Sequence, residues 1–519
     1  MKNIHSVALV ILDGFGYSTH KEHNAIAHAN MPNFMHWWQQ YSYAIISAAG
    51  SAVGLPDGMS GNSEVGHLTL GAGRVIQQPM TVWLNSIDDG SFARNTILCA
   101  QFEALKYAGG ALHIMGLLSD AGVHAHEKQM YASIAAAVDA GIKKIVIHPF
   151  LDGRDVAPQS AHEYLERLTD YIKEYIDHHK STVIIGSLHG RFYAMDRDNN
   201  WDRIEKSYRV LTEKHDGNYD TWEKVLERNY AHAITDEFIP PTQLNAEGQI
   251  NNGDGILFCN VRPDRARQLT RCFVQSIQPV RPEPVEGFIH FVLKPLNLTF
   301  FITPVVYDIQ LPTTVLFPRE PLYNTLKDVL AAHDKTIFTI AETEKYAHVT
   351  YFFRGQNEEP VTTEVQTMIP SLRMQNYIKK PCMSAEEITT TVLKSLRNDP
   401  SDFYLINYAN ADMVGHSGDF DATVKAVECL DVQLKLLYDQ LVQNMGGTLY
   451  ITADHGKAED MYDDATGQPQ TAHTSNPVPF VMIKKDMKSG DVLELKELSD
   501  IAPFILQEMG LPVPDEMKK

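Results

Sequence analysis

Short apolar runs recur along this chain, and each ends in charged or polar residues beside glycine. The first, Val7–Leu12, reads VALVIL and continues into Asp13. Similar runs are LHIMGLLSD, KIVIHPFLDGRD, STVIIGSLHGR, GILFCNVRPDR, DFYLINYANAD and TLYITADHG. Continuous apolar stretches without alternation are typical of strands buried on both faces of a parallel sheet. The sequence therefore predicts an α/β protein built on parallel strands.

Segments with a helical period lie between several of these runs, among them residues 127–140 and 421–441. Such alternation of strand and helix is typical of open parallel sheets, in which ligands bind at the carboxyl ends of the strands. The polar residues that end the runs are therefore candidates for a functional site. The alternative is that they serve only in turns.

The candidate residues fall into two chemical groups that occupy different parts of the chain. Those of metal-ligand type lie near both termini and are Asp13, Asp412, His416, Asp454, His455 and His473. The anion-binding arginines lie in the middle and are Arg154, Arg191, Arg197, Arg262 and Arg265. We infer one discontinuous domain, residues 1–78 and 319–519, interrupted by an inserted domain, residues 79–318. Each would contain a sheet, with the active site in the cleft between them.

Composition limits the classes of partner. A chain of 519 residues is too long for one ordinary core, and its 44% hydrophobic and 21% charged residues are typical of a globular protein. The formal net charge of −20 disfavours a nucleic-acid partner, because phosphate backbones attract basic surfaces. An anionic small molecule would need a local cluster of arginine, lysine or metal ions.

Five cysteines, Cys99, Cys259, Cys272, Cys382 and Cys429, are spread widely along the chain. They form no C-x-x-C pair, so we expect neither a disulfide framework nor a cysteine zinc site, and a reducing cytoplasm fits. The apolar N-terminal run lacks a small-residue cleavage site and does not predict a signal peptide. Lysine and prolines interrupt the apolar stretch 288–306, so no membrane span is predicted.

Spacing within the terminal group favours metal binding. Asp412 and His416 are four residues apart, so one helical turn would present both to one ion. Asp454 and His455 are adjacent, and the glycine after them allows a tight turn. With the two remaining members, the group offers three carboxylates and three imidazoles, enough for two divalent ions. The absence of thiolates favours Mn²⁺ or Zn²⁺, and the carboxylates favour Mn²⁺.

The stretch GMSGNSEVGH, residues 58–67, is rich in glycine like a phosphate-binding loop. A Walker-type loop requires lysine after its last glycine, and here His67 follows Gly66. Ser63 is left as a candidate nucleophile, since two divalent ions would lower the pKa of its hydroxyl. The alternative is that Ser63 only caps a helix, a position that would also stabilise a phosphoseryl anion.

Ten motifs occur in order along nearly the whole chain: VILDGFG, MSGNSEVGH, GAGR, PFLDGRD, GRFYAMDRDNNWDR, RPDRARQLT, AETEKYAHVTYFF, DMVGHSG, TADHG and TAHT. Together they resemble the cofactor-independent (2,3-bisphosphoglycerate-independent) phosphoglycerate mutases of the alkaline phosphatase-like superfamily. The resemblance implies an α/β fold with an alkaline phosphatase-like metal-binding domain and an inserted substrate domain. It also implies interconversion of 3-phosphoglycerate and 2-phosphoglycerate through a phosphoserine intermediate, in glycolysis and gluconeogenesis.

The resemblance assigns roles position by position. One Mn²⁺ is expected on Asp412, His416 and His473, and a second on Asp13, Ser63, Asp454 and His455. Phosphoglycerate is expected on His124, Arg154, Asp155, Arg191, Arg197, Arg262, Arg265 and Lys345. Ser63, Asp155 and Lys345 are the expected catalytic residues, with Ser63 as nucleophile and Asp155 moving the hydroxyl proton. The resemblance also implies a monomer.

The implied reaction begins with attack of Ser63 on phosphorus, which gives a phosphoseryl enzyme and glycerate. The arginines would retain glycerate until its other hydroxyl accepts the phosphoryl group, and closure of the inserted domain would exclude water. Another metal-dependent phosphomutase or phosphatase is the alternative, because the metal-type residues alone do not identify the substrate. A metal-binding protein without catalysis is a second alternative.

Several places depart from the family pattern. Lys457 follows DHG, where the family usually has asparagine, and we expect its side chain to point outward. Thr339 stands at a commonly basic position, and the segments 275–306 and 371–378 match poorly. The proline-rich part, 278–287, is expected to form an exposed loop or insertion. Every expected ligand is retained despite these changes.

Overall fold

The computed structural model describes residues 5–176, 179–215, 217, 219–275, 291–319, 321–374, 377–463, 467–487 and 490–519. By its contacts the chain divides into two compact units. The first, here termed the terminal unit, comprises Met1–Gln78 and Glu320–Lys519, and the second, the inserted unit, comprises Pro79–Arg319. The loop expected over 278–287 lies outside the described residues.

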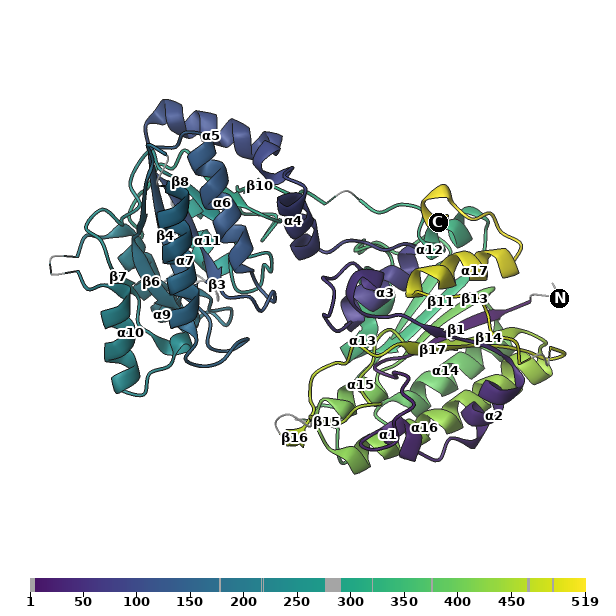
Figure 1. The fold of residues 1–519 in the computed structure, drawn as a ribbon. Helices are drawn as coiled ribbons and strands as arrows, with labels where there is room; N and C mark the ends of the chain where they lie inside the picture. The colour runs from purple at the N-terminus through teal and green to yellow at the C-terminus, as the bar shows by residue number, and fades with distance from the viewer. Residues whose placement is uncertain are drawn as a thin grey trace. The chain divides into compact units, whose positions relative to one another are not determined.

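The terminal unit is built on a sheet of seven described strands (Figure 1). In sheet order these are β12 (Glu364–Ile369), β11 (Ile337–Glu342), β13 (Phe403–Tyr408), β1 (Val7–Leu12), β14 (Thr448–Thr452), β17 (Val478–Lys484) and β2 (Ser42–Ile46). All pairs are parallel except the two that β17 forms. Leu9 in the central β1 lies beside Leu405 and Tyr450. Burial of β1 on both faces explains its uninterrupted apolar sequence.

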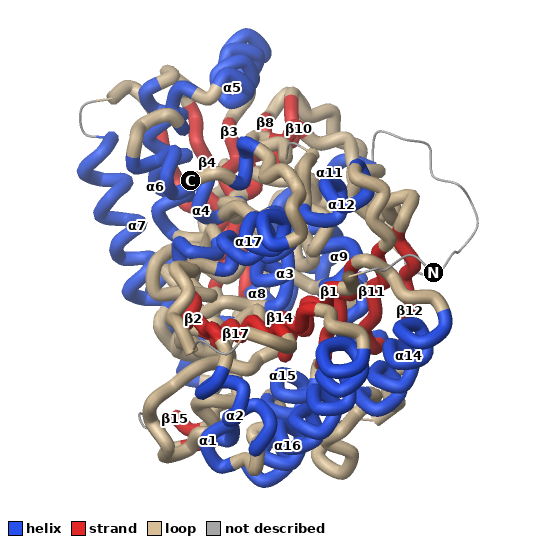
Figure 2. The backbone as a smooth tube through the Cα atoms, turned by 90° about the vertical axis from the view of Figure 1, so that its right-hand side faces the viewer, coloured by secondary structure: helices blue, strands red, loops and turns tan. Residues whose placement is uncertain are grey.

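Helices cover both faces of this sheet, as Figures 1 and 2 show from two directions. One layer contains α1 (Ala25–His28), α2 (Pro32–Gln40), α14 (Ala385–Asn398), α15 (Asn410–Gly415) and α16 (Phe420–Leu437). The other contains α3 (Ser63–Ala72), α12 (Leu326–Ala332) and α17 (Ile501–Glu508). The short helix α13 (Thr343–Ala347) follows β11, and β15 (Tyr462–Asp463) pairs with β16 (Gln468–Pro469).

The inserted unit contains a second sheet, of eight described strands. Its order is β10 (Thr314–Val315), β9 (Phe300–Thr303), β8 (Gly255–Phe258), β3 (Leu112–Leu118), β4 (Lys144–Leu151), β6 (Ser187–Gly190) and β7 (Thr242–Gln243), with β5 (Thr182–Ile185) also beside β4. One apolar core includes residues of α4 (Pro79–Asp88), α5 (Thr96–Ala108), α6 (Glu127–Asp139), α7 (Ala161–Ile176) and α10 (Trp222–Ala231). A second core includes residues of α8 (Arg191–Ala194), α9 (Trp201–Thr212) and α11 (Arg267–Val274).

The α/β class and the two-sheet architecture predicted from the sequence are confirmed. The helix expected over 127–140 is α6, and the one expected over 421–441 is α16, which ends at Leu437 and continues into a π-helical segment, Tyr438–Asn444. The run STVIIGSLHGR forms two strands rather than one: β5 pairs with the first half of β4 and β6 with its last two residues. No helix in the described part of the chain is long and apolar enough to cross a membrane.

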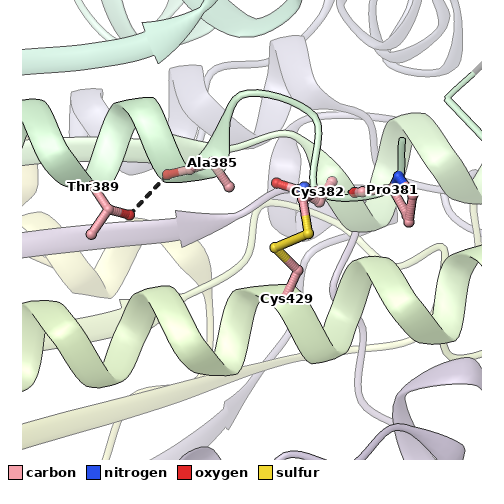
Figure 3. The surroundings of a disulfide bond; sticks show 6 residues. Pro381, Cys382, Ala385, Thr389 and Cys429 are labelled. Atoms are coloured by element: carbon pink, nitrogen blue, oxygen red, sulfur yellow. Dashed lines mark hydrogen bonds between the residues drawn. A yellow bond between two sulfur atoms is a disulfide. The ribbon is translucent and has the colours of Figure 1, made fainter. Parts of the chain in front are cut away.

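A disulfide joins Cys382 to Cys429, so the expectation that the cysteines stay unpaired is wrong for this pair (Figure 3). Cys382 lies in the loop before α14, and Cys429 lies on α16. Their Cα atoms are 5.6 Å apart although the residues are separated by 47 positions. The tertiary fold brings the two cysteines together, and no local cysteine spacing indicates the pairing. The cysteine pattern therefore no longer argues for a reducing compartment.

Candidate active site

The metal-type residues of the terminal unit lie at one edge of its sheet. Asp13 follows β1, Asp412 lies on α15 after β13, and Asp454 with His455 follows β14. Strands β13, β1 and β14 are parallel neighbours, so their carboxyl ends bring these side chains to the same place. All four residues are buried.

Asp412, His416 and His473 form a first group of possible metal ligands. The Nε2 atoms of His416 and His473 lie 3.2 Å and 3.3 Å from Oδ1 of Asp412. The four-residue spacing places the two side chains together as expected: His416 directly follows α15 and lies one helical turn after Asp412. His473 comes from the segment that precedes β17.

The hydrogen bonds of these two histidines show which ring atoms are available to a cation. Nδ1 of His416 donates to the Thr471 carbonyl at 2.8 Å, and Nδ1 of His473 donates to the Gly61 carbonyl at 2.9 Å. A carbonyl oxygen only accepts, so in the neutral rings each Nε2 carries a lone pair. The two Nε2 atoms face each other at 3.0 Å, beside the Asp412 carboxylate. Three electron-pair donors at this spacing fit a divalent cation.

A second group surrounds the hydroxyl of Ser63. Its Oγ donates to Oδ1 of Asp13 at 3.0 Å and lies 3.0 Å from Nε2 of His455. Asp454 completes the group: its Oδ1 accepts from the backbone N–H of Gly14 at 3.2 Å, and its Oδ2 lies 3.7 Å from Nε2 of His455. The group therefore offers carboxylate, hydroxyl and imidazole donors in one buried volume.

The ammonium group of Lys345 lies inside this cluster. Its Nζ is 2.6 Å from both Oδ1 of Asp13 and Oγ of Ser63, and 2.7 Å from Oδ2 of Asp412. Burial opposes charge on these groups, but their mutual attraction outweighs it. The pKa of Lys345 is raised, and the pKa values of Asp13 and Asp412 are held well below their usual range. A residue expected to reach the substrate is thus also the buried counter-ion of two expected metal ligands.

The neighbouring carboxylates also favour the protonated form of His455. Burial lowers its pKa, but the carboxylates of Asp454, Asp13 and Asp412 raise it to about 9. A dication that binds here would displace that proton. Three groups have candidate ligand atoms that all lie within 4.8 Å of one another: Asp412, His416 and His473; Asp13, His67 and Asp454; and Asp13, Asp412 and His455. Oxygen and imidazole donors without thiolate fit divalent ions such as Mn²⁺ and Zn²⁺.

The expected ligand set omits His67, which lies one helical turn after Ser63 on α3. Its Nδ1 lies 2.9 Å from the Ser63 carbonyl and 3.1 Å from Oδ2 of Asp454. Because the carbonyl must accept a hydrogen, Nδ1 carries it and is unavailable to a metal. Nε2 lies 3.0 Å from Nδ2 of Asn407, which donates to Oδ2 of Asp13 at 2.9 Å. Asn407 therefore orients the Asp13 carboxylate, and both ring nitrogens of His67 are already engaged, one by the Ser63 carbonyl and one by Asn407.

Ser63 is the first residue of α3, and the cap of this helix is Asn62. The Asn62 side chain accepts from the backbone N–H of Val65 at 3.2 Å. The alternative that Ser63 serves only as the helix cap is therefore wrong. Its hydroxyl is directed instead to Asp13, His455 and Lys345.

Lys457 is fully buried, so the expectation that it points outward is wrong. Its Nζ donates to the carbonyl of Gln470 at 3.0 Å and lies 3.6 Å from Sδ of Met461. Burial lowers its pKa. The lysine thus anchors the segment that leads to His473.

The arginines of the inserted unit also lie beyond the carboxyl ends of strands. His124 follows β3, Arg154 and Asp155 follow β4, Arg191 begins α8 after β6, Arg197 follows α8, and Arg262 and Arg265 follow β8. Two carboxylates absent from the expected set, Asp152 and Asp264, form ion pairs with arginines of this cluster. Nη1 of Arg191 lies 2.6 Å from Oδ1 of Asp152 and from Oδ2 of Asp155. Nε of Arg262 lies 3.0 Å from Oδ1 of Asp264. The motifs LDGRD and RPDR contain both omitted carboxylates.

Three arginines of this cluster present charge to solvent. The side chains of Arg154, Arg197 and Arg262 are 56%, 46% and 50% exposed. Arg154 pairs with Glu237 at 3.2 Å, and Nη1 of Arg265 donates to the Met195 carbonyl at 3.1 Å. The guanidinium groups are therefore held in place while part of their donor capacity faces outward.

Burial and neighbouring positive charges lower two pKa values in this cluster. Burial, followed by repulsion from Arg191 and Arg262, lowers the pKa of His124 to about 4. Burial and repulsion from three neighbouring arginines lower the pKa of Arg265. His124 is 3% exposed, and its Nδ1 has no hydrogen-bond partner among the described residues. A bound anion would relieve the repulsion and supply acceptors.

Comparison with known proteins gives consistent matches over nearly the whole chain. A model of the metalloenzyme superfamily matches residues 5–513. A 2,3-bisphosphoglycerate-independent phosphoglycerate mutase of Legionella pneumophila (strain Corby) is 44% identical over 512 residues, covering 98% of this chain and 96% of that protein. One of Clostridium novyi (strain NT) is 44% identical over 519 residues, covering 98% of each. A crystal structure of Leishmania mexicana phosphoglycerate mutase at low cobalt concentration aligns with a TM-score of 0.70 and 29% identity, over 99% of this chain and 97% of that one.

Proposed function

The chain belongs to the 2,3-bisphosphoglycerate-independent phosphoglycerate mutases, within the metalloenzyme superfamily, and we propose that its two residue clusters divide the steps of that reaction. The enzyme is an isomerase that interconverts 3-phosphoglycerate and 2-phosphoglycerate. A transfer without an added bisphosphate needs one group that accepts the phosphoryl group and others that retain glycerate. The terminal unit supplies the first, and the inserted unit supplies the others.

The terminal unit binds divalent metal, and the proposed occupant is Mn²⁺ at two positions. The proposed ligands are Asp412, His416 and His473 for one ion, and Asp13, Ser63, Asp454 and His455 for the other. The opposed Nε2 lone pairs of His416 and His473 support the first position. Three carboxylates and no thiolate favour Mn²⁺ over a thiolate-seeking metal. When bound, such a pair of ions stabilises phosphoryl charge and lowers the pKa of a nearby hydroxyl.

Ser63 is the proposed nucleophile. Its oxygen would form a bond to phosphorus as the bond between phosphorus and the substrate oxygen breaks, which leaves glycerate and a phosphoseryl group. The ammonium of Lys345, which contacts Oγ at 2.6 Å, would stabilise negative charge on that oxygen. Because Ser63 begins α3, the free backbone N–H groups of the helix would also favour the phosphoseryl anion.

The arginine cluster is the proposed site for the carboxylate and phosphate oxygens of phosphoglycerate. Its members are His124, Arg154, Asp155, Arg191, Arg197, Arg262 and Arg265. Planar guanidinium groups match these anions with paired hydrogen bonds. Asp155, held by Arg191 at 2.6 Å, is the proposed acceptor and donor of the glycerate hydroxyl proton. Retaining glycerate allows its other hydroxyl to take the phosphoryl group back from Ser63.

Three further assignments are proposed with this function. The discontinuous domain expected from the sequence, residues 1–78 and 319–519, acts as the phosphatase-like metal domain, and the expected inserted domain, residues 79–318, acts as the substrate domain; the two compact units of the structure differ from these bounds only in the placement of Arg319. The protein acts as a monomer, which the mass measured by light scattering would test. It acts in the cytoplasm, where glycolytic substrates are found, and cell fractionation would test this location.

One observation carries the proposal: the Ser63 hydroxyl lies within 3.0 Å of Asp13, His455 and Lys345 in a buried cluster. A coupled enolase assay with Mn²⁺ and 3-phosphoglycerate, without 2,3-bisphosphoglycerate, tests it. We expect 2-phosphoglycerate to form and the phosphoryl group of a trapped intermediate to be found on Ser63 by mass spectrometry. No product, or phosphate on another side chain, would refute the assignment.

A further inference from the structure

The loops that carry the proposed metal ligands meet at a side chain outside every proposed ligand set, Glu459. This residue follows His455 in the same loop and is 2% exposed. A buried carboxylate requires hydrogen-bond donors to compensate for lost water. The identity of those donors indicates what Glu459 does.

Both carboxylate oxygens of Glu459 accept two hydrogen bonds. Oε2 accepts from the backbone N–H of Gly16 at 3.1 Å and of Lys457 at 2.7 Å. Oε1 accepts from Nδ2 of Asn476 at 3.0 Å and from the hydroxyl of Thr474. These donors belong to three separate segments of the chain, one of them near its N-terminus.

Each segment also carries a proposed ligand. Gly16 lies in the loop that begins at Asp13, Lys457 in the loop of Asp454 and His455, and Thr474 directly after His473. The loops come from the ends of β1 and β14 and from the segment before β17. One carboxylate therefore links ligands of both proposed ions.

The loops pack closely around the Glu459 carboxylate. A Cβ atom on Gly16 would collide with the Glu459 carboxylate, and one on Gly456 would collide with the Thr474 hydroxyl. The backbone N–H of Thr474 donates to the Gly456 carbonyl at 3.0 Å, and that of Ala458 donates to the Gly14 carbonyl at 3.0 Å. The loops are packed backbone against backbone around the carboxylate.

We propose that Glu459 is a positioning residue that holds the three ligand loops at the spacing required for metal binding and thereby sets the metal affinity. The inference rests on the ligand assignment proposed above. Groups that orient metal ligands through hydrogen bonds typically change metal affinity or activity by about 10- to 100-fold when they are replaced. Glu459→Gln keeps the shape, but its amide nitrogen would meet donors where an oxygen accepts now.

The test is titration of Mn²⁺ into the chelator-treated full-length protein by calorimetry, with kcat and KM measured at saturating Mn²⁺. We expect Glu459→Gln to raise the Kd for Mn²⁺ by about 10- to 100-fold. KM for 3-phosphoglycerate should change less than about twofold, because the proposed substrate ligands are mostly on the inserted unit. Glu459→Asp, which keeps the charge, should retain more affinity, and Thr474→Val, which removes one donor, should have a smaller effect.

Asp431→Asn is the matched control. Asp431 is equally buried at 2%, and the hydrogen bonds it accepts in the described part of the chain come from Asn33 and Phe34 of α2 rather than from the ligand loops. It should lower stability without changing the Kd for Mn²⁺. A wild-type Kd in Glu459→Gln, or an equal rise in Asp431→Asn, would overturn the inference. Failure of the wild-type protein to bind Mn²⁺ would instead overturn the proposed metal ligands.

Discussion

The hydroxyl of Ser63 and the ammonium of Lys345 lie 2.6 Å apart, and both contact Oδ1 of Asp13. One carboxylate oxygen therefore accepts a hydrogen bond from both the proposed nucleophile and a buried cation. The cation gains more from an anionic oxygen on Ser63 than from a hydroxyl, so it contributes mainly to the transition state.

Ser63→Ala should abolish turnover while leaving the metal content near normal, because three other ligands remain at its position. Asp454→Ala should lose metal as well as activity, since it removes a buried carboxylate. Metal analysis of the purified variants, together with the coupled assay, distinguishes the two. Turnover of Ser63→Ala at the wild-type rate would show that another group is phosphorylated.

Lys345→Met keeps the volume and removes the charge. We expect kcat to fall at least about 100-fold, the loss typical of a group that stabilises transition-state charge. Without metal, the variant should also lose about 3–5 kcal/mol of stability, because buried carboxylates lose their counter-ion. Mn²⁺ should restore part of this loss. Thermal unfolding in EDTA and in Mn²⁺ measures it, and an equal decrease in Tm under both conditions would contradict the prediction.

Arg262→Ala should weaken substrate binding and retain the metals. A charge-assisted hydrogen bond is worth about 1.5–3 kcal/mol, so KM should rise about 10-fold or more. Arg228→Ala is the control, since Arg228 is a comparably exposed arginine of the same unit that pairs with Asp220. An unchanged KM in Arg262→Ala would argue against the arginine cluster as the substrate site.

A hydrogen-bonded row of buried side chains crosses the inserted sheet from Asp254 through His113, His148 and Ser187 to His189. The successive distances are 3.2, 2.9, 2.7 and 2.7 Å. Burial lowers the pKa of all three histidines, in part offset for His113 by Asp254, and that of His189 falls to about 3. An unfolded histidine binds a proton below about pH 6.5, whereas these folded ones do not.

Protonation of these histidines in the unfolded state should therefore leave the free energy of unfolding unaffected above about pH 6.5 and lower it as the pH falls toward 3. His189→Gln keeps a donor toward Ser187 and removes the titrating ring. This variant should lose about 2 kcal/mol less unfolding free energy between pH 7.5 and pH 5 than the wild-type protein does. Urea unfolding at the two pH values measures this loss. A pH dependence of His189→Gln equal to that of the wild-type protein would refute the explanation.

The disulfide between Cys382 and Cys429 closes a loop of 47 positions, which corresponds to up to about 4 kcal/mol from chain entropy. It also anchors the loop whose Pro381 carbonyl accepts from Nδ2 of Asn410, at the start of α15. A dithiol reductant should therefore lower the Tm of the wild-type protein. The double variant Cys382→Ser, Cys429→Ser should unfold at the lower temperature with or without the reductant. A reductant-independent wild-type Tm would show that the bond contributes nothing.

The sequence predicts the parts of this protein that depend on local pattern. Buried parallel strands require continuous apolar runs, so their ends, and with them Asp13 and Asp454, can be located without a structure. The four-residue spacing of Asp412 and His416 likewise survives as one helical turn.

Features that depend on contacts between distant segments could not be predicted. Cys382 and Cys429 have no local spacing signal, and a single lysine at 457 gives no sign of its direction. The role of Glu459 could not be predicted for a similar reason, because one of its hydrogen-bond donors is the backbone N–H of Gly16, 443 positions earlier. Backbone donors are present at nearly every residue, so no sequence motif marks the ones that a buried carboxylate will use.

The central place of β1 between β13 and β14 determines when the protein can first become an enzyme during its synthesis. Asp13 leaves the ribosome about 400 residues before Asp412, an interval of about 20–80 s at ordinary translation rates of about 5–20 residues per second. The whole inserted unit emerges in that time, while the first strand has neither of its sheet neighbours. A nascent chain therefore lacks part of the proposed ligand set until His473 has been added, and we expect metal uptake to mark the end of translation rather than its beginning.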